Sequence, residues 1–162
     1  MIIEDRMRLA ASLEEVWNFL VDIPKVSTCM PGVEDVKEVK PDVYEGKLKV
    51  KIGPVSASFG GVVSIVERVP QQHLAARVEG RDKMTSSSVT ATFEADLAPA
   101  GEGAPASTEL VYKMDVGMRG RLSQFGMAVF KATAKKMTAQ FAECLQNNLS
   151  SGEAEPDQRL SA

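Results

Sequence analysis

Apolar and polar residues along this chain follow spacings that separate helices from strands. Residues 2–10 are predicted to form a first strand, and Ser12 then suits the N-cap of a helix that runs to about Val21. Apolar residues at helical spacing mark one buried face of this helix: Leu13, Val16, Trp17 and Leu20. Pro24 begins a second, very short helix, and Pro31-Gly32 ends it. These two helices are expected to close one end of a sheet.

From Val33 onward the period becomes two, which is the spacing of half-buried strands. This alternation predicts strands over residues 43–52, 55–69, 74–81, 89–96 and 108–118. Gly53-Pro54 is expected to form a turn, and residues 99–105 a flexible surface hairpin. Gly60-Gly61 lies in the middle of a long strand, where it predicts a bulge or a sharp bend. The sheet is therefore expected to be curved.

The last long segment, residues 121–149, is predicted to be a helix with an apolar stripe wider than a coiled-coil seam. Such a helix is expected to lie in the mouth of the sheet. Residues 150–162 are polar and contain Gly and Pro, so a disordered tail is expected. The order of elements predicts one α+β domain over residues 1–149, in which a curved antiparallel sheet of six or seven strands wraps around the C-terminal helix.

Composition narrows the function classes. A net charge of −3 and a pI near 5.3 argue against a nucleic-acid binder, which would need a basic patch. Cys29 and Cys144 are far apart and lack metal-ligand spacing, so buried reduced thiols are expected instead of a disulfide or a zinc site. The N-terminus has no apolar signal core, and no apolar run approaches the ~20 residues of a membrane span. A cytoplasmic protein is therefore expected.

Residues with catalytic chemistry are few. The single histidine, His73, falls in a predicted turn without a second histidine or a nucleophile motif, and is expected to be an exposed turn residue. Asp82, Glu94, Asp96 and Asp115 offer carboxylates, but strand carboxylates at alternate positions are more typical of the wet side of a sheet. No segment matches a phosphate-binding loop. We therefore expect no catalytic residue, no metal and no cofactor.

The methionines allow two interpretations. Five of the eight fall where the corner, the last strand and the long helix should meet: Met30, Met114, Met118, Met127 and Met137. Methionine is flexible and polarizable, so these residues either line a pocket for apolar ligands or simply fill the core. Met30 at the Pro-Gly corner similarly predicts a gate, a membrane-touching tip or a packed corner. The sequence leaves these alternatives open.

Four segments occur in a recognisable order along the chain. They are Thr28-Cys29-Met30-Pro31-Gly32, residues 52–59 (Ile-Gly-Pro-Val-Ser-Ala-Ser-Phe), residues 79–83 (Glu-Gly-Arg-Asp-Lys) and residues 120–126 (Gly-Arg-Leu-Ser-Gln-Phe-Gly). Together they resemble the family of the carbon monoxide dehydrogenase G subunit (CoxG) over about residues 1–149. The resemblance implies the helix-grip fold of the START-like (SRPBCC, Bet v 1-like) superfamily, with two short helices after the first strand.

The resemblance also implies an accessory role for a molybdenum-containing CO-dehydrogenase-type enzyme. It implies non-catalytic binding and delivery of an apolar small molecule, either a lipid or an isoprenoid quinone, and it allows peripheral contact at the inner face of the membrane. The residues expected to line the cavity are taken from the predicted faces: Trp17, Leu20, Met30, Pro31, Leu48, Val50, Ala76, Val78, Phe93, Tyr112, Met114, Met118, Phe125, Val129 and Phe130. The alternatives are an assembly or membrane-recruitment factor without a cargo, and a cyclase or hydrolase on the same fold.

Overall fold

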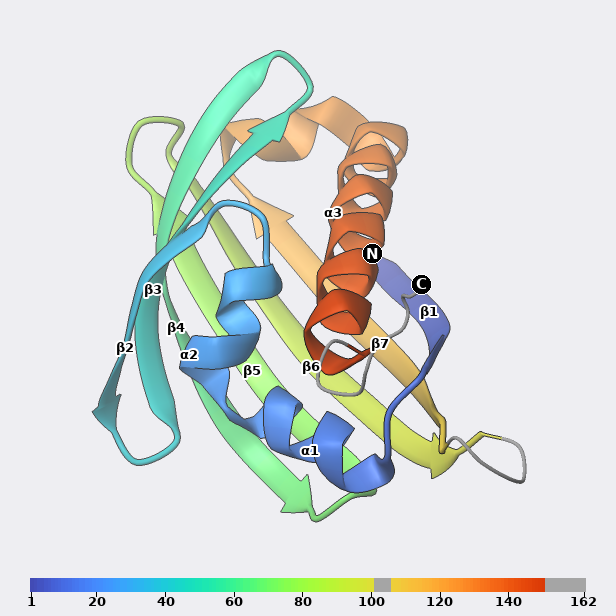
Figure 1. Cartoon of the computed structure of the whole chain (residues 1–162). Helices are drawn as coiled ribbons and strands as arrows, with labels where there is room; N and C mark the ends of the chain where they lie inside the picture. The colour runs from blue at the N-terminus through green and yellow to red at the C-terminus, as the bar shows by residue number, and fades with distance from the viewer. Residues whose placement is uncertain (101–105, 151–162) are drawn as a thin grey trace.

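A computed structural model describes residues 1–100 and 106–150, and seven antiparallel strands within them form one curved sheet (Figure 1). The strands are β1 (Ile2–Leu9), β2 (Val33–Lys40), β3 (Val43–Ile52), β4 (Val55–Val69), β5 (His73–Asp82), β6 (Ser87–Pro99) and β7 (Thr108–Arg119). Their order across the sheet is β1-β7-β6-β5-β4-β3-β2. Most of the predicted hairpin (99–105) and of the predicted tail (150–162) lies outside the described residues, but Pro99 ends β6 and Ser150 ends α3.

The helices cover the concave face of this sheet (Figure 1). They are α1 (Leu13–Val21), α2 (Ile23–Val26), the 3-10 turns η1 (Ser27–Cys29) and η2 (Arg121–Phe125), and α3 (Gly126–Ser150). The predicted start of α1 is confirmed by a capping box, in which the Glu15 N–H donates to Ser12 Oγ and the Ser12 N–H donates to Glu15 Oε1. Among the described residues, no helix is both long enough and apolar enough to cross a membrane.

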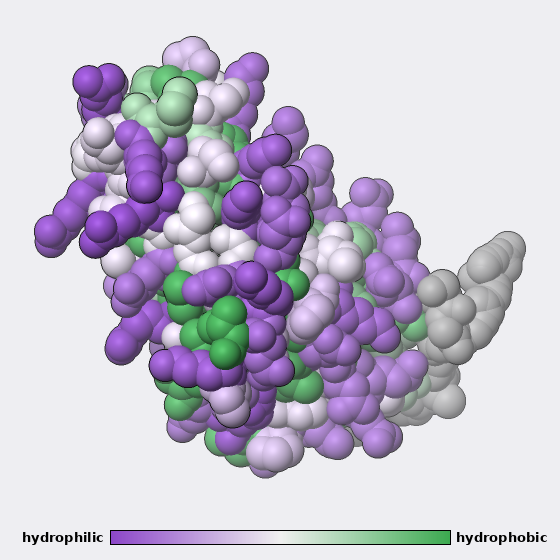
Figure 2. All heavy atoms as spheres, turned by 90° about the vertical axis from the view of Figure 1, so that its left-hand side faces the viewer, coloured by the Kyte–Doolittle hydropathy of each residue, from purple (hydrophilic) through white to green (hydrophobic). Residues whose placement is uncertain are grey.

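The outer face of the sheet is mostly polar and exposed to solvent. Hydrophilic residues cover most of the side of the molecule shown in Figure 2, and hydrophobic residues gather there only in small separate groups. The buried apolar residues instead form two clusters on the concave side. The first core cluster joins α1, the end of α3 and the adjoining ends of the strands: Leu9, Ala11, Val16, Trp17, Phe19, Leu20, Cys29, Leu74, Ala95, Leu97, Leu110, Tyr112, Leu145 and Leu149. The second core cluster, at the other end of the sheet, consists of Ile52, Ala57, Phe59 and Leu122.

The sequence predicted a bulge or a sharp bend at Gly60-Gly61, and the bulge of this strand lies elsewhere. Both glycines pair in regular register with β3 and β5, and the register shift of β4 lies between Ile65 and Glu67. A Cβ atom at Gly61 would lie 2.4 Å from the Glu79 carbonyl oxygen. Glycine is therefore needed at this position because the β5 backbone comes close. The hydrogen-bonded pairing of β4 with its neighbours is regular there.

The predicted helix over 121–149 is divided at its start. Residues 121–125 form the 3-10 turn η2, and α3 begins at Gly126. The turn is fixed to the sheet because the Leu122 N–H donates to Ser87 Oγ, at 3.0 Å, at the start of β6. Gly120 takes a φ of +96°, and a Cβ atom there would lie 2.0 Å from the Ser86 carbonyl oxygen. Only glycine fits this junction.

The expectation of two reduced thiols is wrong. Cys29 at the end of η1 and Cys144 on α3 form a disulfide, with their Cα atoms 5.3 Å apart. The corner made by α1, α2 and η1 folds against the last turns of α3, which brings together two residues separated by 115 positions. Spacing along the sequence gives no sign of such a contact. The bond ties the corner to the long helix.

Candidate functional site

The concave face carries a line of apolar side chains between the two core clusters. Register places in this line one residue from each of five strands, β3 to β7: Tyr44, Val63, Val78, Ala91 and Val116. Val63, Val78 and Val116 are only half-buried, although α3 lies over this face (Figure 1). In the next line, Phe93 and its partner Met114 are also half-buried. These side chains keep accessible apolar surface on the covered side of the sheet.

A row of glycines borders this patch. Gly46, Gly61 and Gly80 are direct neighbours across β3, β4 and β5, on the line between the apolar patch and the second core cluster. They project no side chain toward α3. Val89 and Met118 continue the same line across β6 and β7 and pack against the second core cluster. The strand pairing thus puts the least side-chain volume beside the half-buried apolar residues.

The site residues predicted from the sequence divide among four places. Trp17, Leu20 and Tyr112 are buried in the first core cluster, and Phe93 packs against it. Residues from β3, β7, η2 and α3 pack against the second core cluster: Leu48, Val50, Met118, Phe125, Val129 and Phe130. Ala76, Val78 and Met114 belong to neither cluster, and only Ala76 of these is buried. Met30 and Pro31 are half-buried between η1 and β2.

Polar groups on the concave face already have partners. The Asp82 carboxylate accepts hydrogen bonds from the Met84 N–H at 3.1 Å and from Thr85 Oγ1 at 2.9 Å, which shapes the turn after β5. The Tyr112 hydroxyl forms a hydrogen bond with Thr138 of α3. Burial raises the pKa of Tyr112, and the negative charge of Asp5 adds to this rise, while the Thr138 bond opposes it. Asp82 and Tyr112 therefore have structural roles.

A comparison with protein families agrees with this fold. A profile of the carbon monoxide dehydrogenase G subunit (CoxG) family matches residues 6–150, which is most of the chain. The chain belongs to the CoxG family. No curated protein matches it.

Solved structures show the same fold as this CoxG family member. A conserved protein from Geobacillus kaustophilus is similar with a TM-score of 0.84 and 21% identity, over 95% of this chain and 98% of that one. A START superfamily protein from Mycobacterium smegmatis has a TM-score of 0.69 and 14% identity, over 94% and 99% of the two chains. An aromatase/cyclase from Streptomyces sp. R1128 has a TM-score of 0.63 and 15% identity, over 92% and 93%. The START-like helix-grip fold is confirmed.

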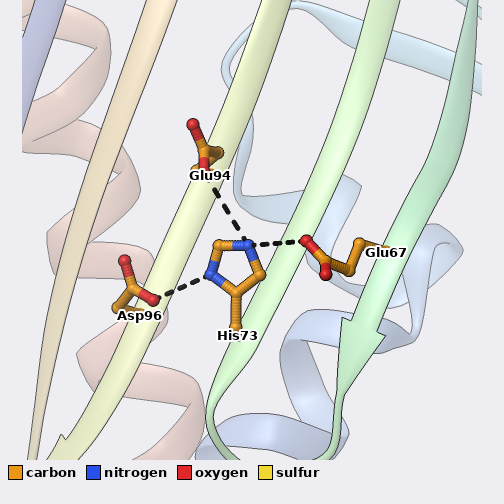
Figure 3. Close-up of polar contacts among 4 residues, drawn as sticks. All are labelled: Glu67, His73, Glu94 and Asp96. Carbon is orange, nitrogen blue, oxygen red and sulfur yellow. Dashed lines mark hydrogen bonds and ion pairs between the residues drawn. The ribbon is translucent and has the colours of Figure 1, made fainter.

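His73 is not the free turn residue that the sequence predicted. It is the first residue of β5, and its side chain, which keeps 20% of its surface accessible, lies among three carboxylates on the face away from the helices (Figure 3). Nδ1 lies 2.8 Å from Asp96 Oδ1, while Nε2 lies 3.2 Å from Glu67 Oε1 and 3.8 Å from Glu94 Oε1. The Asp96 hydrogen bond and the three negative charges raise the pKa of His73, against the effect of burial. Strand pairing creates this cluster, since His73 lies opposite Asp96.

Two hollows of about 400 Å³ each lie away from the apolar patch. One runs between β1 and α3, and the other lies beside the ends of β3, β4 and β5 near Met84. Neither was predicted, because residues far apart in the sequence line each of them. The described side chains include no group of three or more His, Cys, Asp or Glu that could hold a metal ion.

Proposed function

We propose that this CoxG family member binds an apolar small molecule between α3 and the concave face of the sheet, without catalysing a reaction on it. The observation that carries the proposal is the half-buried apolar patch of Val63, Val78, Val116, Phe93 and Met114 under a covering helix. Leaving apolar surface accessible to water inside a fold costs free energy. A ligand that covers this surface recovers the cost.

The proposed cargo is a lipid or an isoprenoid quinone, and the proposed role is accessory to a CO-dehydrogenase-type enzyme. The family description supports the enzyme partnership, and the apolar character of the patch supports the class of cargo. The partners already held by Asp82 and Tyr112 favour binding over catalysis, because an enzyme needs polar groups directed at its substrate. Loading of the cargo from a membrane surface, with Met30 and Pro31 at the mouth, belongs to the same proposal.

The test is native mass spectrometry of the protein incubated with decylubiquinone or with a total lipid extract. We expect retained apolar adducts with the wild-type chain and their loss in Val78→Phe, since Val78 lies in the middle of the patch. Val62→Phe is the matched control, because Val62 is the neighbour of Val63 on β4, is also half-buried, and faces the outer side. Absence of any adduct, or equal adducts in both variants, would contradict the cargo site and favour an assembly factor without cargo.

A further inference from the structure

The two edges of the sheet differ in how well they are protected. At one edge, β2 is interrupted by register shifts between Glu34 and Lys37 and between Glu38 and Lys40. Natural sheets use such irregularities to prevent pairing with another chain. At the other edge, β1 pairs with β7 over all eight of its residues without a shift, and among the described strands it has no neighbour on its other side (Figure 1). β1 is thus a regular strand with an open edge.

The main-chain bonds show which groups of β1 face outward. The Met1 N–H group donates to the Val116 oxygen at 2.8 Å, and the Val116 N–H donates back to the Met1 oxygen at 2.7 Å. Hydrogen-bonded pairs alternate along an antiparallel ladder, so the odd-numbered residues of β1 bond to β7. The even-numbered residues therefore direct their N–H and C=O groups away from β7: Ile2, Glu4, Arg6 and Arg8. Of these N–H groups, that of Arg6 donates to Asp5 Oδ1 at 2.8 Å.

A groove follows this open edge. The hollow of about 400 Å³ beside β1 is lined by residues 2–7 on one side and by α3 on the other. The α3 wall consists mainly of small side chains, with two lysines toward its N-terminal half: Lys131, Ala134, Lys135, Thr138, Ala139 and Ala142. Small residues on the helix leave room next to the strand for another backbone. The groove thus has the two features that strand addition needs, which are main-chain groups directed away from β7 and clearance. The Arg6 N–H must exchange its bond to Asp5 Oδ1 for one to the added strand.

We propose that the occupant is β1 of a second copy of this chain, which pairs antiparallel with the first around a two-fold axis at Asp5. In this register Glu4 of one copy lies opposite Arg6 of the other, and the two-fold axis repeats the pair. Ile2 lies opposite Arg8, so the outward-facing residues pair with one another, as an antiparallel ladder requires. On the inner face Ile3 lies opposite Met7, beside the small side chains of α3.

This register and the two closest to it in position each bring one pair of like charges together at the axis, and they differ in which charge that is. A shift by two residues in one direction places Arg6 opposite Arg6, and a shift in the other direction places Glu4 opposite Glu4. Like charges directly opposite each other destabilise a strand pair. In the proposed register the two Asp5 carboxylates approach each other at the axis, within the grooves that Lys131 and Lys135 line with positive charge. A single pair of short strands makes a small interface, so the dimer is a weak one. It does not depend on bound cargo.

The experiment is sedimentation velocity of the full chain over a dilution series, with a charge swap across the proposed pair. Glu4→Arg and Arg6→Glu are each expected to raise the dimer dissociation constant about tenfold, because the two-fold axis repeats every lost contact. Arg6→Glu also removes the ion pair between Arg6 and Glu109 of the same chain, at 3.4 Å, so Glu4→Arg is the cleaner single variant. The double variant restores the opposite charges and is expected to return within about threefold of wild type. Asp5→Asn removes the repulsion at the axis and is expected to tighten the dimer. Thermal melting of each variant at low concentration checks that the monomer remains folded.

Three results would overturn the proposal. The first is a wild-type chain that sediments as a monomer at every concentration. The second is a dimer in which the double variant does not recover the loss of the single ones. The third is a full chain that stays monomeric while a chain lacking residues 151–162 dimerises, because the occupant of the groove would then be the chain's own C-terminal segment. Recovery by the swap, together with tightening by Asp5→Asn, would establish the β1 pair and its register.

Discussion

At the scale of single residues, His73 is held by carboxylates that two neighbouring strands present on the outer face of the sheet. Glu67 comes from β4, and Glu94 and Asp96 come from β6 (Figure 3). This cluster lies on the opposite face from the proposed cargo site, so it bears on stability and not on binding. A histidine that gains negative partners on folding binds its proton more tightly in the folded state than in the unfolded one.

The first prediction is a pH-dependent cost of His73→Gln. Because folding raises the pKa of His73 above its ordinary value near 6.5, the stabilisation is fully present below pH 6.5 and is lost as the pH rises through the folded-state pKa. Urea unfolding at pH 5.5 and pH 9 should therefore show a larger loss of unfolding free energy for His73→Gln at pH 5.5. Asp96→Asn should reduce the same difference. An equal loss at both pH values would show that the charge on His73 contributes nothing.

At the scale of elements, two glycines flank the 3-10 turn η2, with Gly120 before it and Gly126 after it, and Gly120 is the more constrained of the two. Gly120 and Gly126 both have positive φ, at +96° and +80°, so alanine is strained at either position. Only at Gly120 would the new Cβ meet the backbone, 2.0 Å from the Ser86 oxygen; at Gly126 nothing lies within 4 Å. The pair therefore separates conformational strain from steric overlap.

The second prediction follows from this pair. Gly120→Ala should lower the free energy of unfolding by about 1–3 kcal/mol more than Gly126→Ala, which is the usual cost of forcing extra volume into a packed site. Chemical denaturation of both variants at neutral pH measures the difference. Equal losses would mean that the β7–η2 junction moves freely, and that the contact between Ser87 and Leu122 does not fix the start of α3.

The disulfide gives a third prediction. Closing a loop between Cys29 and Cys144, 115 residues apart, restricts the unfolded chain, and the loop-closure model gives about 4–5 kcal/mol for a loop of this length. The double variant Cys29→Ala, Cys144→Ala should unfold at clearly lower denaturant concentration than wild type, and wild type in dithiothreitol should approach it. If reduction leaves the wild-type transition unchanged, the two thiols are not joined in the folded protein.

These element-level features also show what the sequence could predict. Alternation of polar and apolar residues predicted the strands from β3 to β7 and the curved sheet, because one face of each strand had to be buried, but it gave no bounds for β2. It could not place the β4 bulge, since Gly61 serves a close approach of β5 and not a bulge. Nor could it reveal the Cys29–Cys144 bond or the partners of His73, because both arise only when segments distant in the sequence pack together or pair in register.

At the scale of the whole molecule, the proposed cargo site separates two clusters that pack independently. The first core cluster joins α1 to the end of α3, and the second core cluster joins η2 to the tips of β3 and β4. Of the half-buried residues between them, Val78 and Met114 were among the residues expected from strand faces, whereas Val63 and Val116 were not. Trp17, Leu20 and Tyr112 face the same interior but are buried in the first cluster, because strand and helix periodicity identifies the inner side and not the depth of packing.

A ligand between the clusters should stabilise the fold as a unit, which is the last prediction. A molecule that binds only the folded chain adds about 2.7 kcal/mol at a free concentration of one hundred times its dissociation constant. For a chain of this length that corresponds to a rise in melting temperature of about 5–10 °C. Differential scanning calorimetry with increasing decylubiquinone should show this rise for wild type and for Val62→Phe, but not for Val78→Phe. A rise of the same size in Val78→Phe would place the ligand elsewhere, with the groove between β1 and α3 as the next site to probe.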